Sequence, residues 1–125
     1  MIYIDSSVLL AALFSESKAP PRSIWAEKLV SSTLLEYETI NRVHAREGDR
    51  NAAESLLAGV DLLDLSAARL ARALSPFPLP VGTLDGLHLS TMDYLARRGQ
   101  SLSLASYDKR FVACARALGF AIFDL

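Results

Sequence analysis

Four acidic residues in this 125-residue chain have the types and positions of a binding site for a divalent cation. They are Asp5, Glu38, Asp85 and Asp108, each following an expected strand or lying on an expected helix. Hard cations such as Mg²⁺ and Mn²⁺ prefer oxygen ligands, and Mg²⁺ commonly links carboxylates to substrate phosphates. A bound cation lowers the pKa of a water and stabilises the leaving oxygen, while a neighbouring carboxylate holds or deprotonates that water. The four residues therefore predict metal-dependent cleavage of phosphodiester bonds.

Three of the four acids also have ordinary structural explanations. Asp5 and Asp108 each precede an expected helix, and Asp is a favoured N-cap residue. Asp85 lies in the first turn of another expected helix, where a carboxylate complements the helix dipole. From the sequence alone, structural roles and cation binding both remain open for these three residues.

Glu38 is harder to explain structurally. It follows Leu34 by four residues and Leu35 by three, so it shares their apolar side of an expected helix. Glu36 points about 200° away around that helix and is expected in solvent. A carboxylate on a core-facing stripe is costly unless it is paired or bound to a cation. A salt bridge with Arg42, one turn further along, is the alternative.

Polar residues beside the four acids could support them. His88 follows Asp85 by three residues, and we expect a packed, hydrogen-bonded histidine, with metal ligation as the alternative. Ser6, Ser7 and Ser106 could donate hydrogen bonds to the carboxylates or to a phosphate. Capping and turn roles are equally open for these serines.

The overall charge excludes one class of function. The chain carries 13 Lys and Arg against 14 Asp and Glu, a net charge of −1, so it is not a general polyanion binder. Binding of nucleic acid would need local basic residues or a bound cation. Lys109 and Arg110 follow Asp108 directly and could reach an RNA backbone, or could be solvated at the start of a helix.

The elements that would position these residues alternate between strand and helix. Gly48 is expected just past the end of one helix. Asn51 and Glu54 are expected to form a capping box at the start of the next, and Ser66 to cap the one after that. We expect strands over 2–4, 60–65, 101–106 and 120–123, a loop over 75–82, and helices over 7–14, from Pro20-Pro21 through Trp25 and Leu29, and over 33–47, 51–58, 66–75, 83–98 and 108–118.

This alternation predicts an α/β fold with a parallel sheet covered by helices on both faces. In such folds ligands gather at the carboxyl ends of the strands. The strand at 2–4 runs into Asp5, and the strand at 101–106 runs past Tyr107 into Asp108. Two carboxylates should therefore meet at one edge of the sheet.

Length and composition fit a single globular domain over residues 1–125, with 51% hydrophobic and 22% charged residues. No apolar run approaches the roughly 20 residues needed to cross a bilayer, so we expect no membrane association. The first residues lack the basic region of a signal peptide. The single Cys114 excludes an internal disulfide and a Cys-based zinc site, which suits a reducing cytoplasm.

Four short sequence motifs follow one another along the chain: Ile4-Asp5-Ser6-Ser7, Ser31-Ser32 with Leu35-Glu36-Tyr37-Glu38, Thr83-Leu84-Asp85-Gly86-Leu87-His88-Leu89, and Ser106-Tyr107-Asp108-Lys109-Arg110-Phe111. With the late segment Ala117-Leu118-Gly119-Phe120, they resemble PIN-domain nucleases, most closely the VapC-type toxins, which are the ribonuclease halves of bacterial and archaeal toxin–antitoxin pairs. Each motif alone is a weak signal, but their order and spacing over essentially the whole chain make a strong one. Gly86 and Ser90 depart from the family, which more often has alanine at both positions.

The resemblance implies a PIN-like three-layer α/β/α sandwich with a central, mostly parallel sheet, and a Mg²⁺- or Mn²⁺-dependent endoribonuclease activity. It places the family's acidic quartet on Asp5, Glu38, Asp85 and Asp108. Asp5 and Asp85 would be the main metal ligands, and Glu38 and Asp108 would complete the site directly, through water or through a second metal. It also implies homodimers and inhibition by a cognate VapB-like antitoxin whose C-terminal segment lies across the active-site groove.

Three other functions fit parts of the sequence. A PIN nuclease outside toxin–antitoxin biology, such as an RNA-processing enzyme, would use the same chemistry. A PIN fold without catalysis could act as a binding partner, but the complete quartet argues against it. A receiver-like signalling module would need a phospho-accepting Asp just after a central strand, whereas Asp61 and Asp64 lie within an expected strand. The apolar residues that could contact a second copy or an antitoxin, with core packing as the expected use, are Trp25, Leu29, Leu56 and Leu57.

Overall fold

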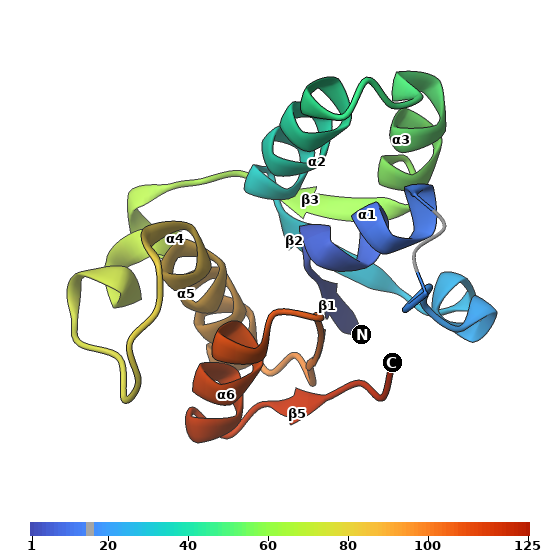
Figure 1. Ribbon diagram of the computed structural model, residues 1–125. Helices are drawn as coiled ribbons and strands as arrows, with labels where there is room; N and C mark the ends of the chain where they lie inside the picture. Colours follow the sequence, from blue (N-terminus) through green and yellow to red (C-terminus); the bar gives the residue numbers. More distant parts are fainter. Residues whose placement is uncertain (15–16) are drawn as a thin grey trace.

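The sheet at the centre of the molecule is built from parallel strands, as expected. The structure is a computed structural model that describes residues 1–14 and 17–125. Within those residues the strand order is β3-β2-β1-β4-β5, so β1 lies in the middle and β4 is its direct neighbour. Strands β1, β2 and β3 are labelled in Figure 1. The strands are β1 (Ile2–Ile4), β2 (Leu29–Ser32), β3 (Val60–Leu63), β4 (Ser103–Ala105) and β5 (Ala121–Ile122).

Helices cover both faces of this sheet, which confirms the three-layer α/β/α arrangement (Figure 1). Residues of α1, α2 and α3 pack on one face, and residues of α5 and α6 pack on the other. No helix in the described ranges is long and apolar enough to cross a membrane. The helices are α1 (Ser6–Leu13), α2 (Leu34–Ala45), α3 (Arg50–Leu57), α4 (Ala67–Leu70), α5 (Thr83–Arg97) and α6 (Lys109–Ala117), with two 3-10 helices, η1 (Arg22–Ala26) and η2 (Ala71–Leu74).

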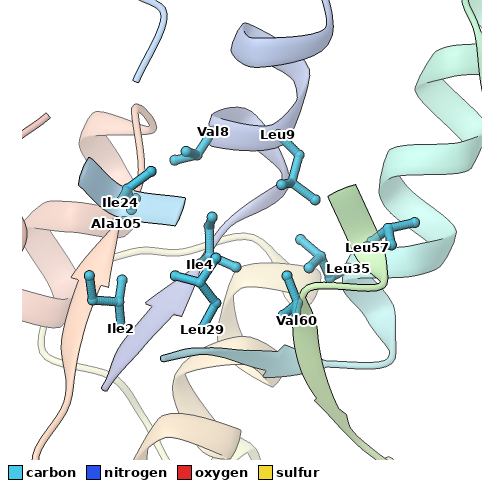
Figure 2. Close-up of a cluster of buried hydrophobic side chains, with 10 residues drawn as sticks. All are labelled: Ile2, Ile4, Val8, Leu9, Ile24, Leu29, Leu35, Leu57, Val60 and Ala105. Atoms are coloured by element: carbon cyan, nitrogen blue, oxygen red, sulfur yellow. The ribbon is translucent and has the colours of Figure 1, made fainter. Parts of the chain in front are cut away.

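Strand β1 joins two hydrophobic clusters because successive residues of a strand point to opposite faces of the sheet. Ile2 and Ile4 enter the first cluster, where they pack with residues of α1, α2 and α3 (Figure 2). Tyr3 enters the second cluster, with residues of α5 and α6. Full burial of a large apolar side chain stabilises a fold by about 1.5–3 kcal/mol. Packing on both faces thus fixes the central strand, and with it the position of Asp5 at its carboxyl end.

The sequence does not predict β2, and the single helix expected from Pro20-Pro21 through Leu29 is wrong. The 3-10 helix η1 ends at Ala26, and Leu29 begins a strand. Leu29 and Val30 are both buried, one in each hydrophobic cluster, so the segment alternates between the two faces of the sheet. Periodicity alone cannot distinguish so short an apolar run from part of a buried helix.

Four apolar residues, for which contact with a second copy or an antitoxin is the alternative to core packing, lie in the core or against it. Leu29 and Leu57 belong to the first cluster, and Trp25 and Leu56 are partly buried and pack against it. Core packing is therefore confirmed as the use of these side chains in the folded chain.

Two of the expected helix ends differ in detail. Asp49, not Asn51, caps α3, because its carboxylate accepts a first-turn backbone N–H at 3.1 Å. After α2 the left-handed residue is Glu47, with φ of 52°, rather than Gly48. Gly48 is needed for space instead, since a Cβ there would lie 3.0 Å from the ring of Phe14. The expected cap by Ser66 at the start of α4 is confirmed, and Gly99, just past α5, has a left-handed φ of 83°.

Ser90 and Gly86, the two positions that depart from the family pattern, each have a neighbour in the structure that bears on the residue found there. The buried Ser90 hydroxyl of α5 donates to the carbonyl of Arg69 at 2.7 Å and accepts the N–H of Ala73 at 3.2 Å. These two hydrogen bonds connect α4 and η2 to α5. A Cβ at Gly86 would lie 3.3 Å from the ring of Phe77, so an alanine there requires this ring to give way.

A substitution in the second cluster tests this packing. Leu89 is fully buried, and Leu89→Ala should lower the free energy of unfolding by about 2–5 kcal/mol because it removes buried methyl groups and leaves a cavity. Urea denaturation measures this value. The matched control is Leu74→Ala, at a side chain that is 91% exposed, which should change stability by less than about 0.5 kcal/mol. Equal effects at the two positions would contradict the packing described here.

Candidate active site

The four expected acids converge at the carboxyl ends of β1 and β4. Asp5 follows β1, Asp108 follows the neighbouring β4, Asp85 lies in the first turn of α5, and Glu38 lies on α2. Partial burial and then the negative charges of Asp5, Asp108 and Glu38 together raise the pKa of Asp85 to about 6. Carboxylates that perturb one another in this way form one electrostatic cluster, which we call the acidic cluster.

Asp5 is the most buried member of the acidic cluster, with 4% of its surface exposed. Its Oδ2 accepts hydrogen bonds from the hydroxyls of Ser7 at 2.7 Å and Ser106 at 2.8 Å. Burial raises the pKa of the Asp5 carboxyl, and the two serine bonds oppose that rise. Asp5 occupies the N-cap position of α1, but its side chain makes no capping bond, so capping, one of the two roles left open for it, is not observed.

The two serines are themselves oriented by the backbone of the loop after β4. Ser7 Oγ accepts the N–H of Tyr107 at 3.0 Å, and Ser106 Oγ accepts the N–H of Asp108 at 3.0 Å. Each hydroxyl proton is therefore free to point at Asp5. This confirms the supporting hydrogen bonds expected of Ser7 and Ser106. Ser6 makes no such bond in the described part of the chain.

Glu38 is paired with a histidine, not with the arginine considered above. Its Oε1 lies 2.5 Å from Nε2 of His88, and no ion pair joins Glu38 to Arg42 among the described residues. The His88 side chain is fully buried, and its Nδ1 lies 2.7 Å from the hydroxyl of Tyr3. The packed, hydrogen-bonded role expected for His88 is thus confirmed. Glu36, as expected, is exposed.

Asp108 serves as a helix cap, the structural role that the sequence left open. Its Oδ1 accepts the backbone N–H groups of Arg110 at 3.0 Å and Phe111 at 3.3 Å, at the start of α6. Its charge nevertheless contributes to the raised pKa of Asp85, so it belongs to the acidic cluster as well. Lys109 and Arg110 are exposed at this end of α6.

A cleft of about 510 Å³ opens beside Glu38, and its basic lining was missed by sequence reasoning. Lys18, Arg42 and Arg46 lie along it, together with Tyr107. Arg42 and Arg46 follow Glu38 by four and eight residues, the spacing of one face of a helix, which is the signal that could have found them. A larger cleft of about 610 Å³ lies over α4, η2 and the later turns of α5 and contains none of the four acids.

The donor set of the acidic cluster fits a hard divalent cation. Ligand atoms of Asp5, Glu38 and His88 lie within 4.8 Å of one another. The Nε2 of His88 is already engaged by Glu38, which leaves carboxylate oxygens as the available donors. Oδ1 of Asp5 accepts no hydrogen bond from the described residues, so this oxygen is available to a ligand. Carboxylate oxygens are the donors that Mg²⁺ and Mn²⁺ prefer.

Solved structures with similar folds include one toxin and one toxin–antitoxin complex. The crystal structure of Mycobacterium tuberculosis VapC20, a sarcin-ricin loop cleaving toxin, aligns over 100% of both chains with a TM-score of 0.71 and 19% identity. A toxin–antitoxin complex from Klebsiella pneumoniae aligns over 89% of this chain and 90% of that one, with a TM-score of 0.63 and 16% identity. At these identities the likeness supports the fold alone.

Sequence comparison extends the likeness to particular relatives. Ribonuclease VapC46 of Mycobacterium tuberculosis (strain ATCC 25618 / H37Rv) is 38% identical, covering 97% of this chain and 95% of its own length. Ribonuclease VapC47 of the same species (strain CDC 1551 / Oshkosh) is 29% identical, covering 96% and 93%. The model of the PIN domain family matches residues 2–117. The chain therefore belongs to the PIN-domain family, among the VapC-type proteins.

Proposed function

We propose that this protein is a divalent-metal-dependent endoribonuclease that acts as the toxin of a toxin–antitoxin pair. The observation that carries the proposal is the acidic cluster, in which a buried Asp5 lies with three further carboxylates at the carboxyl ends of two adjacent strands. Such a group of like charges is costly without a bound cation. The names of the two ribonuclease relatives supply the substrate class.

The proposed roles follow from the contacts of each carboxylate. Asp5 and Asp85 would be the main metal ligands, with Asp5 using the oxygen that the serines leave free. Glu38, whose Oε1 is held by His88, has its other oxygen available to hold or deprotonate a water. Asp108 would act directly, through water or at a second metal, because one of its oxygens caps α6. The cation would activate a water and neutralise charge on the scissile phosphate.

The substrate would lie in the cleft beside Glu38. Arg42 and Arg46 extend from Glu38 along one side of α2, at a rise of about 6 Å for each four residues. Guanidinium groups recognise phosphate oxygens through charge-assisted hydrogen bonds. These arginines and Lys18 are better placed for an RNA backbone near the cluster than Lys109 and Arg110, which line neither described cleft and remain proposed outer contacts.

The biological setting is proposed from the relatives. VapC20 is a toxin and the Klebsiella structure is a toxin–antitoxin complex, which supports a VapB-like antitoxin as the partner we propose. The homodimer that we also propose follows from the family resemblance alone. An RNA-processing PIN nuclease would use the same chemistry without an antitoxin. Expression without a partner separates the two, because a toxin should arrest growth and a processing enzyme should not. The receiver-like alternative gains no support, since Asp61 and Asp64 are exposed rather than clustered with Asp5.

Isosteric substitutions test the assigned site. Asp5→Asn and Asp85→Asn should each lower the rate of RNA cleavage in Mg²⁺ or Mn²⁺ by on the order of 100-fold or more, because each removes a charge that holds the cation. Cleavage of a labelled RNA, with EDTA as the metal-free control, measures the effect. Glu36→Gln, an exposed acid on the same helix as Glu38, should leave the rate unchanged. Full activity in both Asp variants would refute the site assignment.

The raised pKa of Asp85 makes a separate prediction for the metal-free protein. An acid whose pKa is raised by folding favours the folded state below its unfolded value, near 3.8, and that contribution is lost as the pH rises through about 6. The stability of Asp85→Asn relative to wild type should therefore increase between pH 4 and 7. Urea denaturation in EDTA at a series of pH values measures this difference.

The control for this pH series is Asp61→Asn, at an exposed acid of β3. Its stability relative to wild type should not follow the same pH dependence, because Asp61 lies outside the acidic cluster. A difference for Asp85→Asn that stays constant from pH 4 to 7 would contradict the electrostatic crowding on which the proposal depends.

A further inference from the structure

His88 lies within a chain of hydrogen bonds that runs through the core to the acidic cluster. The backbone N–H of Ser32 lies 3.1 Å from the Tyr3 hydroxyl, which lies 2.7 Å from Nδ1 of His88. On the far side of the ring, Nε2 lies 2.5 Å from Oε1 of Glu38. Tyr3 and His88 are both fully buried, so no water competes for these contacts.

For a neutral imidazole beside an ionised Glu38, the chemistry of the partners gives each bond one direction. A carboxylate only accepts hydrogen bonds, so the contact with Glu38 requires a proton on Nε2 of His88. In the neutral imidazole, Nδ1 is then an acceptor. The oxygen of Tyr3 accepts the N–H of Ser32, and its own proton is available to donate to Nδ1. The chain therefore runs from Ser32 through Tyr3 and His88 to Glu38, and the Ser32 hydroxyl, 3.4 Å from Nδ1, is a second partner of that nitrogen.

Packing holds the imidazole ring in this orientation. Phe111 stacks on His88 with ring centroids 6.0 Å apart and an interplanar angle of 23°. Tyr3 meets the same ring edge-on, at 5.6 Å and 78°. All three side chains are fully buried. An imidazole ring enclosed in this way cannot flip, and so swap the positions of Nδ1 and Nε2, unless its neighbours repack.

This arrangement matters because His88 is otherwise a candidate metal ligand. One of its ring nitrogens lies within 4.8 Å of carboxylate oxygens of Asp5 and Glu38, and Nε2 is the nitrogen that contacts Glu38. A nitrogen that carries a proton has no lone pair to give to a cation. Removing the imidazole from the donor set leaves oxygen ligands, which suit Mg²⁺ and Mn²⁺, whereas imidazole suits Zn²⁺.

We propose that Tyr3 and His88 are positioning residues that orient Glu38 and, by keeping the proton on Nε2, restrict the acidic cluster to oxygen ligands and hence to hard divalent cations. This inference rests on the proposed function only in assuming that the cluster binds a cation. The direction of the hydrogen bonds is a property of the metal-free chain and can be tested without RNA.

The first test reads the tautomer directly. Nitrogen NMR of the metal-free protein, labelled with ¹⁵N-histidine at neutral pH, distinguishes a protonated ring nitrogen from an unprotonated one. The spectrum of His88→Gln identifies which signals belong to His88 rather than to His44, the other histidine of the chain. We expect a proton on Nε2 and none on Nδ1. A proton on Nδ1, alone or together with one on Nε2, would overturn the inference.

The second test changes the donor to Nδ1. Tyr3→Phe removes one of the two contacts that favour a proton on Nε2, the other being the contact with Glu38. Nδ1 can then donate to Ser32 Oγ, which lies 3.4 Å away, so a larger fraction of the protein can offer the lone pair of Nε2 to a cation. The preference of the site for Zn²⁺ over Mn²⁺ should rise by about 10-fold. Displacement of bound Mn²⁺ by Zn²⁺, followed by electron paramagnetic resonance, measures this ratio. The matched control is Tyr94→Phe, at a tyrosine under Arg98 in the other cleft, which should match wild type.

A folded Tyr3→Phe protein with the metal preference of wild type would overturn the selectivity part of the inference, and thermal unfolding shows whether the variant is folded. If Tyr3→Phe does not fold, the tautomer of the wild-type protein still decides the inference. A wild-type protein that shows the expected tautomer but cleaves no RNA would refute the proposed function and leave this inference standing.

Discussion

Electrostatic repulsion within the acidic cluster is the constraint around which the rest of the molecule is arranged. Asp5 is almost completely buried, and partial burial together with the charges of Asp5, Asp108 and Glu38 raises the pKa of Asp85. Taking such charges out of water is costly unless donors or a cation compensate. The fold supplies a fixed donor to three of them, since two serines bond Asp5, His88 bonds Glu38, and the start of α6 bonds Asp108. A divalent cation would supply the remaining positive charge.

The parallel sheet brings the carboxylates together through ordinary strand ends and helix starts. Because β1 and β4 are adjacent and parallel, the residues after them emerge at one edge, where α5 and α6 also begin. The positive end of a helix dipole favours an acid in the first turn, as at Asp85, or at the cap, as at Asp108. Packing of β1 on both faces fixes the position of Asp5 at this edge of the sheet. Fold stability and site geometry therefore depend on the same strand.

The sequence predicts the parts of this arrangement that depend on local pattern. The strand before Asp5 and the helix face of Glu38 follow from runs and spacing over a few residues. What it does not predict depends on contacts between distant segments. Strand β2 is defined by its neighbours in the sheet rather than by its own short apolar run. Tyr3 and His88, which contact each other, are 85 positions apart in the sequence. The same histidine, rather than the nearby Arg42, is the partner of Glu38.

The central claim is that a divalent cation completes the acidic cluster, and direct metal binding tests it. Isothermal titration of the metal-free protein with Mn²⁺ at neutral pH should show a saturable site in the wild-type chain. The same titration of Asp5→Asn should show that site lost or greatly weakened, since Asp5 contributes the oxygen left free by Ser7 and Ser106. Absence of binding in wild type, or equal affinity in the variant, would contradict the account.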